Sequence, residues 1–378
     1  MFCFIRPKKR NSMKMSLPII AATLMLALFS CTDKGSVDIP VNDWPWGDEQ
    51  EEEVVPPVDQ PDDPIVEEPE KDQYVESNQS FLDAGWVNVR EDFGELPNYI
   101  GVYKSPVKLE EKSAIAYIAV ADMSMAKWDV WSVKADNNYK TTDSYKTPEK
   151  VYEATEAPII INGGYFFYEG GNYTSSLAVS AGKVLAYNIN YASKDWVKIY
   201  APTRAAFLQK ADGSFDACWT YWTGSSHYTY QKPADNSYDE DPQPTPSSTF
   251  PEKAVKFAAQ TAIGGGPVLI NAGEVVNTWS EEMFDVGGVN PTSNNPRTAL
   301  GVTADSKLIF FVCEGRNKTE GVAGFTTGDV ANILYGLGCV EAINLDGGGS
   351  TCMLVNGKET IKVSDGSQRA VASAVMMF

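Results

Sequence analysis

Four apolar segments of the sequence each end at residues suited to chemistry. These residues are Asn162 with Gly163 and Gly164, the triple glycine 264–266, Glu314 with Gly315 and Arg316, and Asp346 with Gly347, Gly348, Gly349 and Ser350. Apolar segments of this length are typical of buried strands. If the four segments share a sheet, we expect their ends to converge on one site.

The residue types indicate binding of an anion and cleavage of a sugar bond. Successive glycines expose backbone N–H groups to an anion, which favours Gly265 and Gly266 or the 347–349 loop as a phosphate cradle. An arginine can hold a phosphate through two parallel hydrogen bonds, and Arg297 and Arg316 are the candidate clamps. Two carboxylates, Glu314 and Asp346, could divide the roles of acid and of nucleophile or base in glycoside cleavage. The sequence leaves open which carboxylate has which role.

Each feature also has a structural interpretation. A triple glycine is usually a turn, and the two acids could form salt bridges with the two arginines. A metal-dependent phosphodiesterase could use the same carboxylates with Asn162 and Asn344 as oxygen ligands for Ca²⁺ or Mg²⁺. His227 is the only histidine, and we expect it at the surface, so the sequence gives little support to a histidine-based triad.

Strands and a helix must position these residues. The apolar run 114–123 reads as a strand buried on both faces, and 297–316 reads as two strands joined by a turn. A helix is predicted from a cap at Thr326 or Thr327 to Gly338, because apolar residues repeat between them at helical spacing. The pattern predicts an α+β (mixed α/β) fold: a mixed sheet with few helices and with the catalytic loops at strand ends.

The globular part has two predicted regions. Residues 77–150 form a small N-terminal strand-rich region, and 151–378 form the main domain. A polar stretch at 135–150 marks the boundary between them. The segment 220–250, rich in Tyr, Ser and Pro, is predicted to be a long loop that is functional or disordered.

The N-terminus is predicted to direct export. Residues 1–30 combine a basic start with the apolar run 17–29, which is typical of a signal peptide. The following LFSC resembles a bacterial lipobox, in which Cys31 would be acylated; an ordinary cleaved signal with an incidental cysteine is the alternative. Residues 31–76 are acidic and proline-rich, which predicts an extended tether. We therefore expect a lipid-anchored protein of the cell envelope, at the outer membrane or the periplasmic face.

Composition excludes some classes of partner. The chain has 378 residues, 43% of them hydrophobic, and a formal net charge of −19, so it can bury a sizeable core and lacks the basic character of a nucleic-acid-binding protein. Residues 43–76 carry 14 of the acidic residues against a single lysine, which leaves the fold only mildly acidic. Outside the leader there are four cysteines, whose spacing matches no zinc site and leaves any disulfide pairing open.

Six segments together resemble the phosphodiester glycosidase family. They are INGGYF at 161–166, GGGPVLI at 264–270, PRTALGVT at 296–303, VCEGR at 312–316, LGCVEAINLDGGGSTCMLVNG at 337–357 and SDGSQRAVASAV at 364–375. The order agrees with the family across roughly 150–378. NLDGGGST with an upstream PRTA is specific, whereas INGGYF alone would be weak.

The resemblance implies a hydrolase that cleaves the bond between the anomeric carbon of a sugar and a phosphate, without a required cofactor. It adds Thr298 and Arg369 to the candidate binding residues. The family more often has Asp where this chain has Glu314, so this carboxylate reaches one methylene further. The expected partners are a carbohydrate phosphodiester and, through the anchor, a membrane; we expect a monomer. A glycan-binding surface lipoprotein without turnover is the other alternative.

Overall fold

The structure is a computed structural model that describes residues 74–168, 171–285 and 288–378. The predicted signal peptide, Cys31 and nearly all of the predicted tether lie outside these ranges. The described residues belong to one compact unit. No helix within the described ranges is long and apolar enough to cross a membrane.

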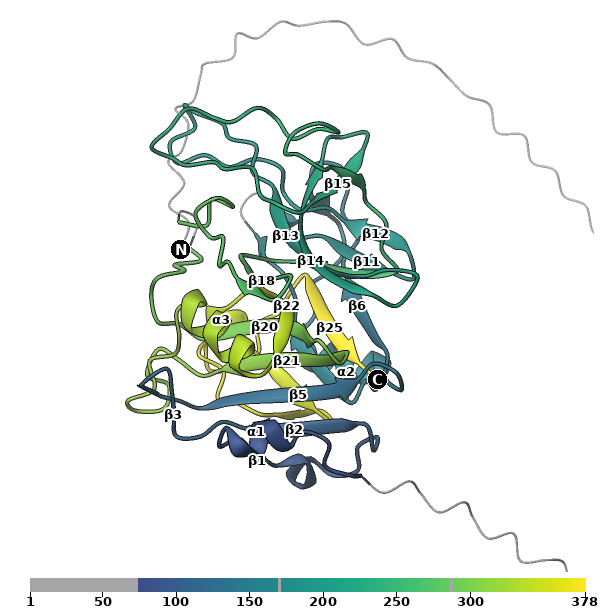
Figure 1. The fold of residues 1–378 in the computed structure, drawn as a ribbon, viewed down its shortest axis with the longest axis vertical. Coiled ribbons are helices and arrows are strands. Elements are labelled where there is room, and N and C mark those ends of the chain that lie inside the picture. The colour runs from purple at the N-terminus through teal and green to yellow at the C-terminus, as the bar shows by residue number, and fades with distance from the viewer. Residues whose placement is uncertain (1–73, 169–170, 286–287) are drawn as a thin grey trace, which may run out of the picture. The chain divides into compact units, whose positions relative to one another are not determined.

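An eight-stranded sheet forms the centre of this unit (Figure 1). Its strands, in spatial order, are β1 (Val87–Asn88), β2 (Ile100–Lys104), β5 (Ala116–Asp122), β21 (Lys307–Cys313), β20 (Arg297–Thr303), β22 (Cys339–Asn344), β18 (Val268–Asn271) and β19 (Glu274–Val275). All residues of β20 are buried, as are all of β21 except Lys307. Such continuous burial is expected for strands that are covered on both faces.

Two further sheets pack on this one. The five-stranded sheet has the order β24 (Lys358–Glu359), β23 (Met353–Val355), β8 (Ile159–Asn162), β25 (Ser373–Met377) and β6 (Trp128–Ser132). The seven-stranded sheet has the order β12 (Lys183–Ala186), β11 (Ala178–Ser180), β17 (Thr261–Gly264), β13 (Arg204–Gln209), β14 (Phe215–Trp222), β15 (His227–Tyr230) and β16 (Val255–Lys256). One apolar core joins all three sheets through residues such as Leu300, Ile161 and Phe207.

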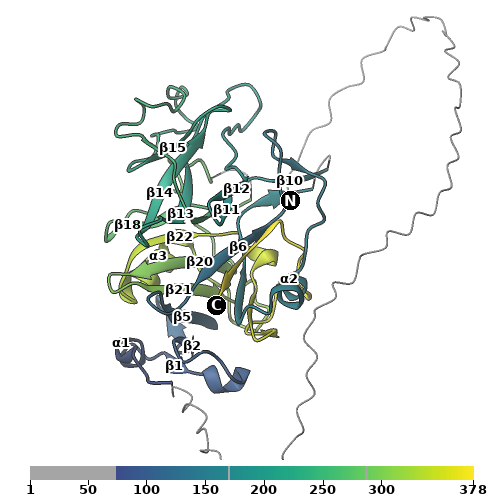
Figure 2. The same ribbon diagram turned by 90° about the vertical axis from the view of Figure 1, so that its right-hand side faces the viewer.

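Small strands and helices complete the unit. A three-stranded sheet has the order β7 (Lys140–Thr141), β10 (Asn172–Thr174) and β9 (Phe166–Phe167), and β3 (Lys108–Leu109) pairs with β4 (Lys112–Ser113). The helices are α1 (Gln79–Asp83), α2 (Pro148–Thr155) and α3 (Thr327–Gly336), with the 3₁₀ turns η1 (Arg90–Phe93) and η2 (Gly348–Ser350). Helix α3 packs on the eight-stranded sheet and α2 on the five-stranded sheet, and Figure 2 shows the two helices on opposite sides.

Local signals in the sequence account for much of this architecture. Thr326 caps α3 in a capping box with Asp329, and the apolar stripe of this helix is buried against the sheet. Gly338 follows the helix with φ of 84°. The turn at Asn356 and Gly357 has positive φ at both residues, as a type I′ hairpin turn requires. The predicted buried strand at 114–123 corresponds to β5.

Some features differ from the prediction. The small number of helices is confirmed, but the mixed sheet is not observed, because every strand pair in the described ranges is antiparallel. The segment 220–250 begins as the hairpin β14–β15, not as a loop. Cys218, Cys313, Cys339 and Cys352 are buried free thiols.

The strands of region 77–150 complete the sheets of the C-terminal region. β5 pairs with β21 along seven residues, and β6 pairs with β25 along five. Without these partners, β21 and β25 would become unpaired edges with buried apolar side chains, which promote aggregation. The N-terminal region therefore contributes to the same hydrophobic core as the strands that carry the candidate site.

We expect a fragment of residues 74–378 to unfold in one cooperative transition and a fragment of residues 151–378 to remain unfolded or to aggregate. The reason is the loss of β5 and β6 from their sheets. Urea unfolding followed by tryptophan fluorescence, together with gel filtration, measures both. A soluble 151–378 fragment with cooperative unfolding would contradict this role of the N-terminal strands.

Candidate active site

Asp346 lies on a loop that leaves the central sheet after β22. Its backbone N–H donates to the carbonyl of Gly163 after β8, at 3.1 Å, and the N–H of Gly348 donates to the carbonyl of Pro296 before β20, at 2.9 Å. The loop is therefore bound to two other strand ends. These ends come from different sheets, so the predicted convergence occurs between packed sheets and not along one sheet edge.

Asn162 holds this loop in place from the end of β8. Its Nδ2 donates to the carbonyl of Asp346 at 2.7 Å, while Oδ1 accepts from Thr298 Oγ1 at 2.7 Å and from the N–H of Cys352 at 3.1 Å. Asn162 and Thr298 are fully buried, and these bonds use the Asn162 oxygen. The predicted roles of Asn162 and Thr298 in binding substrate are therefore corrected: both position the loop. Oδ1 of Asn162 is likewise not available as a metal ligand.

The glycines 264–266 form a support and not a phosphate cradle. Their N–H groups donate to backbone carbonyls of Leu177, Ala205 and Asn344, which corrects the predicted anion-binding role of Gly265 and Gly266. Asn344 Nδ2 donates to the carbonyl of Gly266 at 2.9 Å and to the Tyr165 hydroxyl at 3.0 Å. Buried Asn344 therefore fixes Tyr165 beside the loop, and its Oδ1 has no hydrogen-bond partner within the described part.

The Asp346 carboxylate lies in a protected position. Burial raises its pKa to about 6. Hydrogen bonds from the Ser350 side chain and the Gly347 backbone lower the pKa, as do the positive charges of Arg369 and Arg316, but burial has the larger effect. Desolvation destabilises the charged form of a carboxylate, so Asp346 takes up a proton more readily than an exposed aspartate. Asp346 is therefore poised to change its charge near neutral pH.

Arg316 and Arg369 lie over the glycine turn 348–349. A methyl group on Gly348 would lie 2.6 Å from Nη2 of Arg316, and one on Gly349 would collide with Arg369. Nη1 of Arg369 donates to Ser350 Oγ at 3.3 Å. The side chains of Arg316 and Arg369 are 49% and 36% exposed, so both are partly open to solvent. Two accessible guanidinium groups beside a carboxylate and a hydroxyl can hold a phosphate group.

Arg297 does not belong to this anion site. It is 2% exposed, and its guanidinium group donates to four backbone carbonyls at 2.7–3.0 Å, those of Phe325, Val289, Asn290 and Ser293. The prediction that Arg297 clamps phosphate is therefore wrong. Since its donors are used by the chain, Arg297 instead anchors the segment 289–297 to the start of α3.

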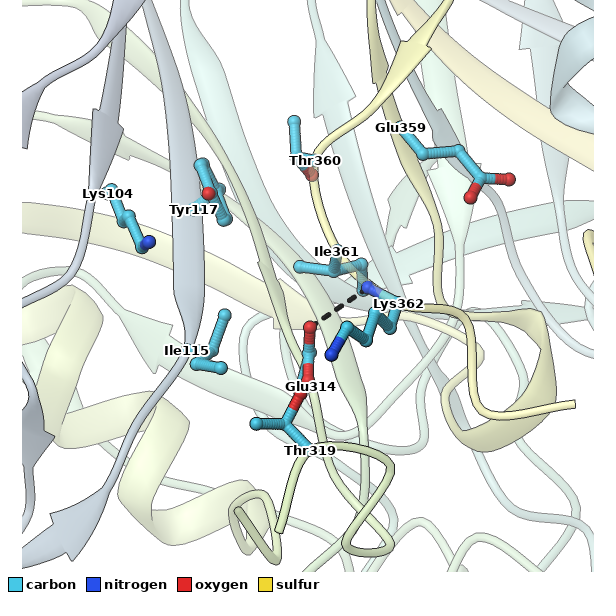
Figure 3. Close-up of a pocket in the computed structure, with 9 residues that line it drawn as sticks. All are labelled: Lys104, Ile115, Tyr117, Glu314, Thr319, Glu359, Thr360, Ile361 and Lys362. Carbon is cyan, nitrogen blue, oxygen red and sulfur yellow. Dashed lines mark hydrogen bonds between the residues drawn. The ribbon is translucent and has the colours of Figure 1, made fainter. Parts of the chain in front are cut away.

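Glu314 faces a different pocket from the groups around Asp346. It is 3% exposed; Oε1 accepts from the N–H of Lys362 at 3.0 Å, and Oε2 has no partner within the described ranges. Glu314 and Lys362 line a pocket of about 440 Å³ together with Lys104 and Tyr117. Figure 3 shows these side chains around the pocket. The groups that shift the pKa of Asp346, which are Ser350, Gly347, Arg369 and Arg316, do not line this pocket. The two predicted carboxylates therefore have different surroundings, and no hydrogen bond joins them within the described ranges.

Two further side chains lie at the site, and sequence reasoning missed the first of them. The carboxylate of Asp365 contacts both Arg316 and Arg369, and its signal was an acid four residues before an arginine in SDGSQR. Tyr168 is 53% exposed, and its hydroxyl donates to the carbonyl of Ala370 at 2.9 Å, directly after Arg369. It belongs to the aromatic run at 165–168, whose sequence is compatible with contact to a sugar ring and with packing alone. His227, by contrast, stacks on Phe257 at 4.0 Å, and burial lowers its pKa to about 3.

We expect Arg297→Ala to lower the free energy of unfolding by about 3 kcal/mol or more, since it leaves four carbonyls without their donor. Arg297→Lys should also destabilise, because an ammonium group cannot reproduce the planar set of donors. Arg316→Ala is the matched control and should change the free energy of unfolding by about 0.5 kcal/mol or less. Urea unfolding measures all three. Equal stability of the two alanine variants would contradict the structural role of Arg297.

We expect Asp346→Asn to stabilise the protein above pH 6. A carboxylate whose pKa rises on folding stabilises the fold in its protonated form, and this contribution is lost as pH rises through about 6. The variant and the parent should therefore be equally stable near pH 4. At pH 8 the variant should be more stable by about 1–2 kcal/mol, allowing for partial solvent screening. Urea unfolding across this range measures the difference, and a variant that is less stable at pH 8 would contradict the expected cost of the buried charge.

Comparison with known proteins places the chain in a family. Among curated proteins, the uncharacterised SPbeta prophage-derived protein YomE of Bacillus subtilis (strain 168) is 36% identical over 81 residues; these are 21% of this chain and only 12% of that protein. Three solved structures are similar at low identity. A hypothetical protein from Synechocystis is 16% identical, with 74% of this chain and 62% of that chain covered and a TM-score of 0.48. The catalytic domain of zebrafish N-acetylglucosamine-1-phosphodiester alpha-N-acetylglucosaminidase, auto-inhibited by its pro-peptide, is 19% identical, with 73% of this chain and 82% of that chain covered and a TM-score of 0.49. A putative exported protein from Burkholderia pseudomallei K96243 is 17% identical, with 70% of this chain and 74% of that chain covered and a TM-score of 0.49. The family model for phosphodiester glycosidase matches residues 155–378, more than half of the chain. The chain therefore belongs to the phosphodiester glycosidase family.

Proposed function

We propose that the protein hydrolyses the bond between the anomeric carbon of a sugar and the oxygen of a phosphodiester, on the envelope side of a membrane. The observation that carries this proposal is the pair of accessible guanidinium groups, Arg316 and Arg369, above the glycine turn that presents Asp346 and Ser350. Membership of the phosphodiester glycosidase family supports the same reaction.

Arg316 and Arg369 would bind the phosphate and stabilise the charge that it gains as the bond to the sugar breaks. Stabilisation of a developing negative charge by fixed donors is usually a large part of catalysis. The phosphate is a good leaving group, so little general-acid assistance is needed. This small requirement agrees with the placement of Glu314 in a pocket that the groups acting on Asp346 do not line.

Asp346 would act in its ionised form, as nucleophile or as the base that activates water. In both cases water supplies a hydroxyl group to the anomeric carbon, the bond from that carbon to oxygen breaks, and the remaining proton ends on the phosphate side. The products are a reducing sugar and a phosphomonoester. Tyr168, exposed beside Arg369, offers an aromatic face to a sugar ring.

The location at the envelope rests on the leader and on Cys31. A lipid on Cys31 and the acidic segment after it would keep the hydrolase near the membrane while allowing it to reach glycan phosphodiesters at the surface. Mass spectrometry of the membrane-extracted protein would detect the acylated cysteine. Release of the protein by a Cys31→Ser change is the expected effect on its localisation.

We expect hydrolysis of a sugar-1-phosphodiester in ¹⁸O water to place the label on the sugar. The value of kcat/KM should rise between pH 5 and 7 with an apparent pKa near 6, since Asp346 must lose its proton. Asp346→Asn should lower kcat/KM about 10³-fold, and Arg316→Ala or Arg369→Ala about 10²-fold each. Lys183→Ala, on an exposed position of β12, is the control for loss of a surface charge.

Three results would overturn the proposal. Label in the phosphate, with activity lost to a chelator, would indicate a metal-dependent phosphodiesterase. Binding of the diester without any product would indicate a glycan-binding protein. Full activity of Asp346→Asn would remove this carboxylate from the mechanism.

A further inference from the structure

Asp365 occupies the space between the two arginines of the anion site. One of its carboxylate oxygens contacts Nη2 of Arg369, and the other lies 3.9 Å from Nη1 of Arg316. We propose that Asp365 is a specificity-determining residue that makes the site prefer a singly charged phosphodiester to a doubly charged phosphomonoester. This inference rests on the proposed function, because it concerns the phosphate site of the same reaction.

The carboxylate of Asp365 is held at the site by a turn. Val363 is buried in the apolar layer under α2, and the N–H of Gly366 donates to its carbonyl at 3.1 Å. Gly366 has φ of 88°, a conformation that favours glycine. The backbone of Asp365 therefore lies between the buried Val363 and the turn at Gly366. Its side chain is 39% exposed.

Five charged side chains determine the electrostatic character of this site. Arg316 and Arg369 are positive, and Nζ of Lys318 would lie 3.7 Å from a methyl group on Gly366. Asp346 and Asp365 are negative. With both carboxylates ionised, these groups sum to one positive charge, which matches one negative charge on the ligand. Without Asp365 they would sum to two positive charges.

The substrate and the product of the proposed reaction differ in charge. A phosphodiester carries one negative charge, whereas a phosphomonoester loses its second proton near pH 6 and carries close to two at pH 8. Coulomb energy is proportional to the charge of the ligand, so Asp365 repels the dianion about twice as strongly as the monoanion, in free energy. Asp365 would therefore weaken binding of the phosphomonoester product and favour its release.

Dimethyl phosphate and methyl phosphate are suitable probes, because they differ by one charge and contain no sugar bond to cleave. We expect Asp365→Asn, in the full-length protein, to tighten the Kd of dimethyl phosphate about 3-fold and that of methyl phosphate about 10-fold at pH 8. At pH 5, where methyl phosphate is singly charged, both factors should be about 3-fold. Isothermal titration calorimetry measures all four affinities.

Control variants separate the local charge from other effects. Asp83→Asn makes the same change of charge on α1 and should leave both Kd values unchanged. Asp365→Ser also removes the charge, so it should tighten the Kd of methyl phosphate more than that of dimethyl phosphate at pH 8. Thermal unfolding checks that each variant remains folded. A last control removes the change in charge of Asp346 with pH. In the Asp346→Asn background, adding Asp365→Asn should still tighten methyl phosphate about 10-fold at pH 8 and about 3-fold at pH 5.

Equal factors for the two probes at pH 8, unchanged affinities, or no binding of either probe would overturn the inference. Failure of the proposed function would appear separately, as a parent protein that binds the probes in this pattern but hydrolyses no sugar phosphodiester. Hydrolysis with equal factors would show the reverse: a correct reaction in which Asp365 has no selective role.

Discussion

The side-chain amide of Asn162 is the constraint on which the rest of the site depends. It joins the end of β8 in the five-stranded sheet to the Asp346 loop and to Thr298 on β20 of the central sheet. A buried amide with each of these bonds made has one favourable orientation, and leaving a partner unsatisfied is costly. The geometry of the loop therefore follows from the packing of two sheets and not from the glycine sequence alone.

Charged side chains around this loop differ in burial. Arg297 donates to carbonyls inside the protein, whereas the side chains of Arg316 and Arg369 are partly exposed. Asp346 is protected enough for burial to raise its pKa to about 6, yet it lies beside these two cations. A desolvated carboxylate and neighbouring like charges cost stability, as is common at functional sites.

Local patterns predicted the elements well. The cap at Thr326, the apolar stripe of α3, the hairpin at Asn356 and Gly357 and the buried strand β5 all depend on residues close together in the chain. Their energies come from nearby groups, so a short sequence is enough to predict them. Asp346, Ser350, Arg316 and Arg369 are each predicted as site residues. The structure places them together, and their role in binding or catalysis stays a hypothesis.

The sequence by itself determined that apolar strands end at glycines, acids and arginines, and it determined the family through the order of these motifs. Only the tertiary structure decided which way each side chain faces. Arg297 and Arg316 are the same residue type. Arg297 is bound by carbonyls of Phe325 and of the segment 289–293, whereas the side chain of Arg316 is half exposed. For the same reason Glu314, which the sequence predicted at the site, lines another pocket, whereas Asp365, which it did not predict, contacts Arg316 and Arg369. Burial and distance depend on contacts between residues far apart in the chain, and no local pattern contains that information.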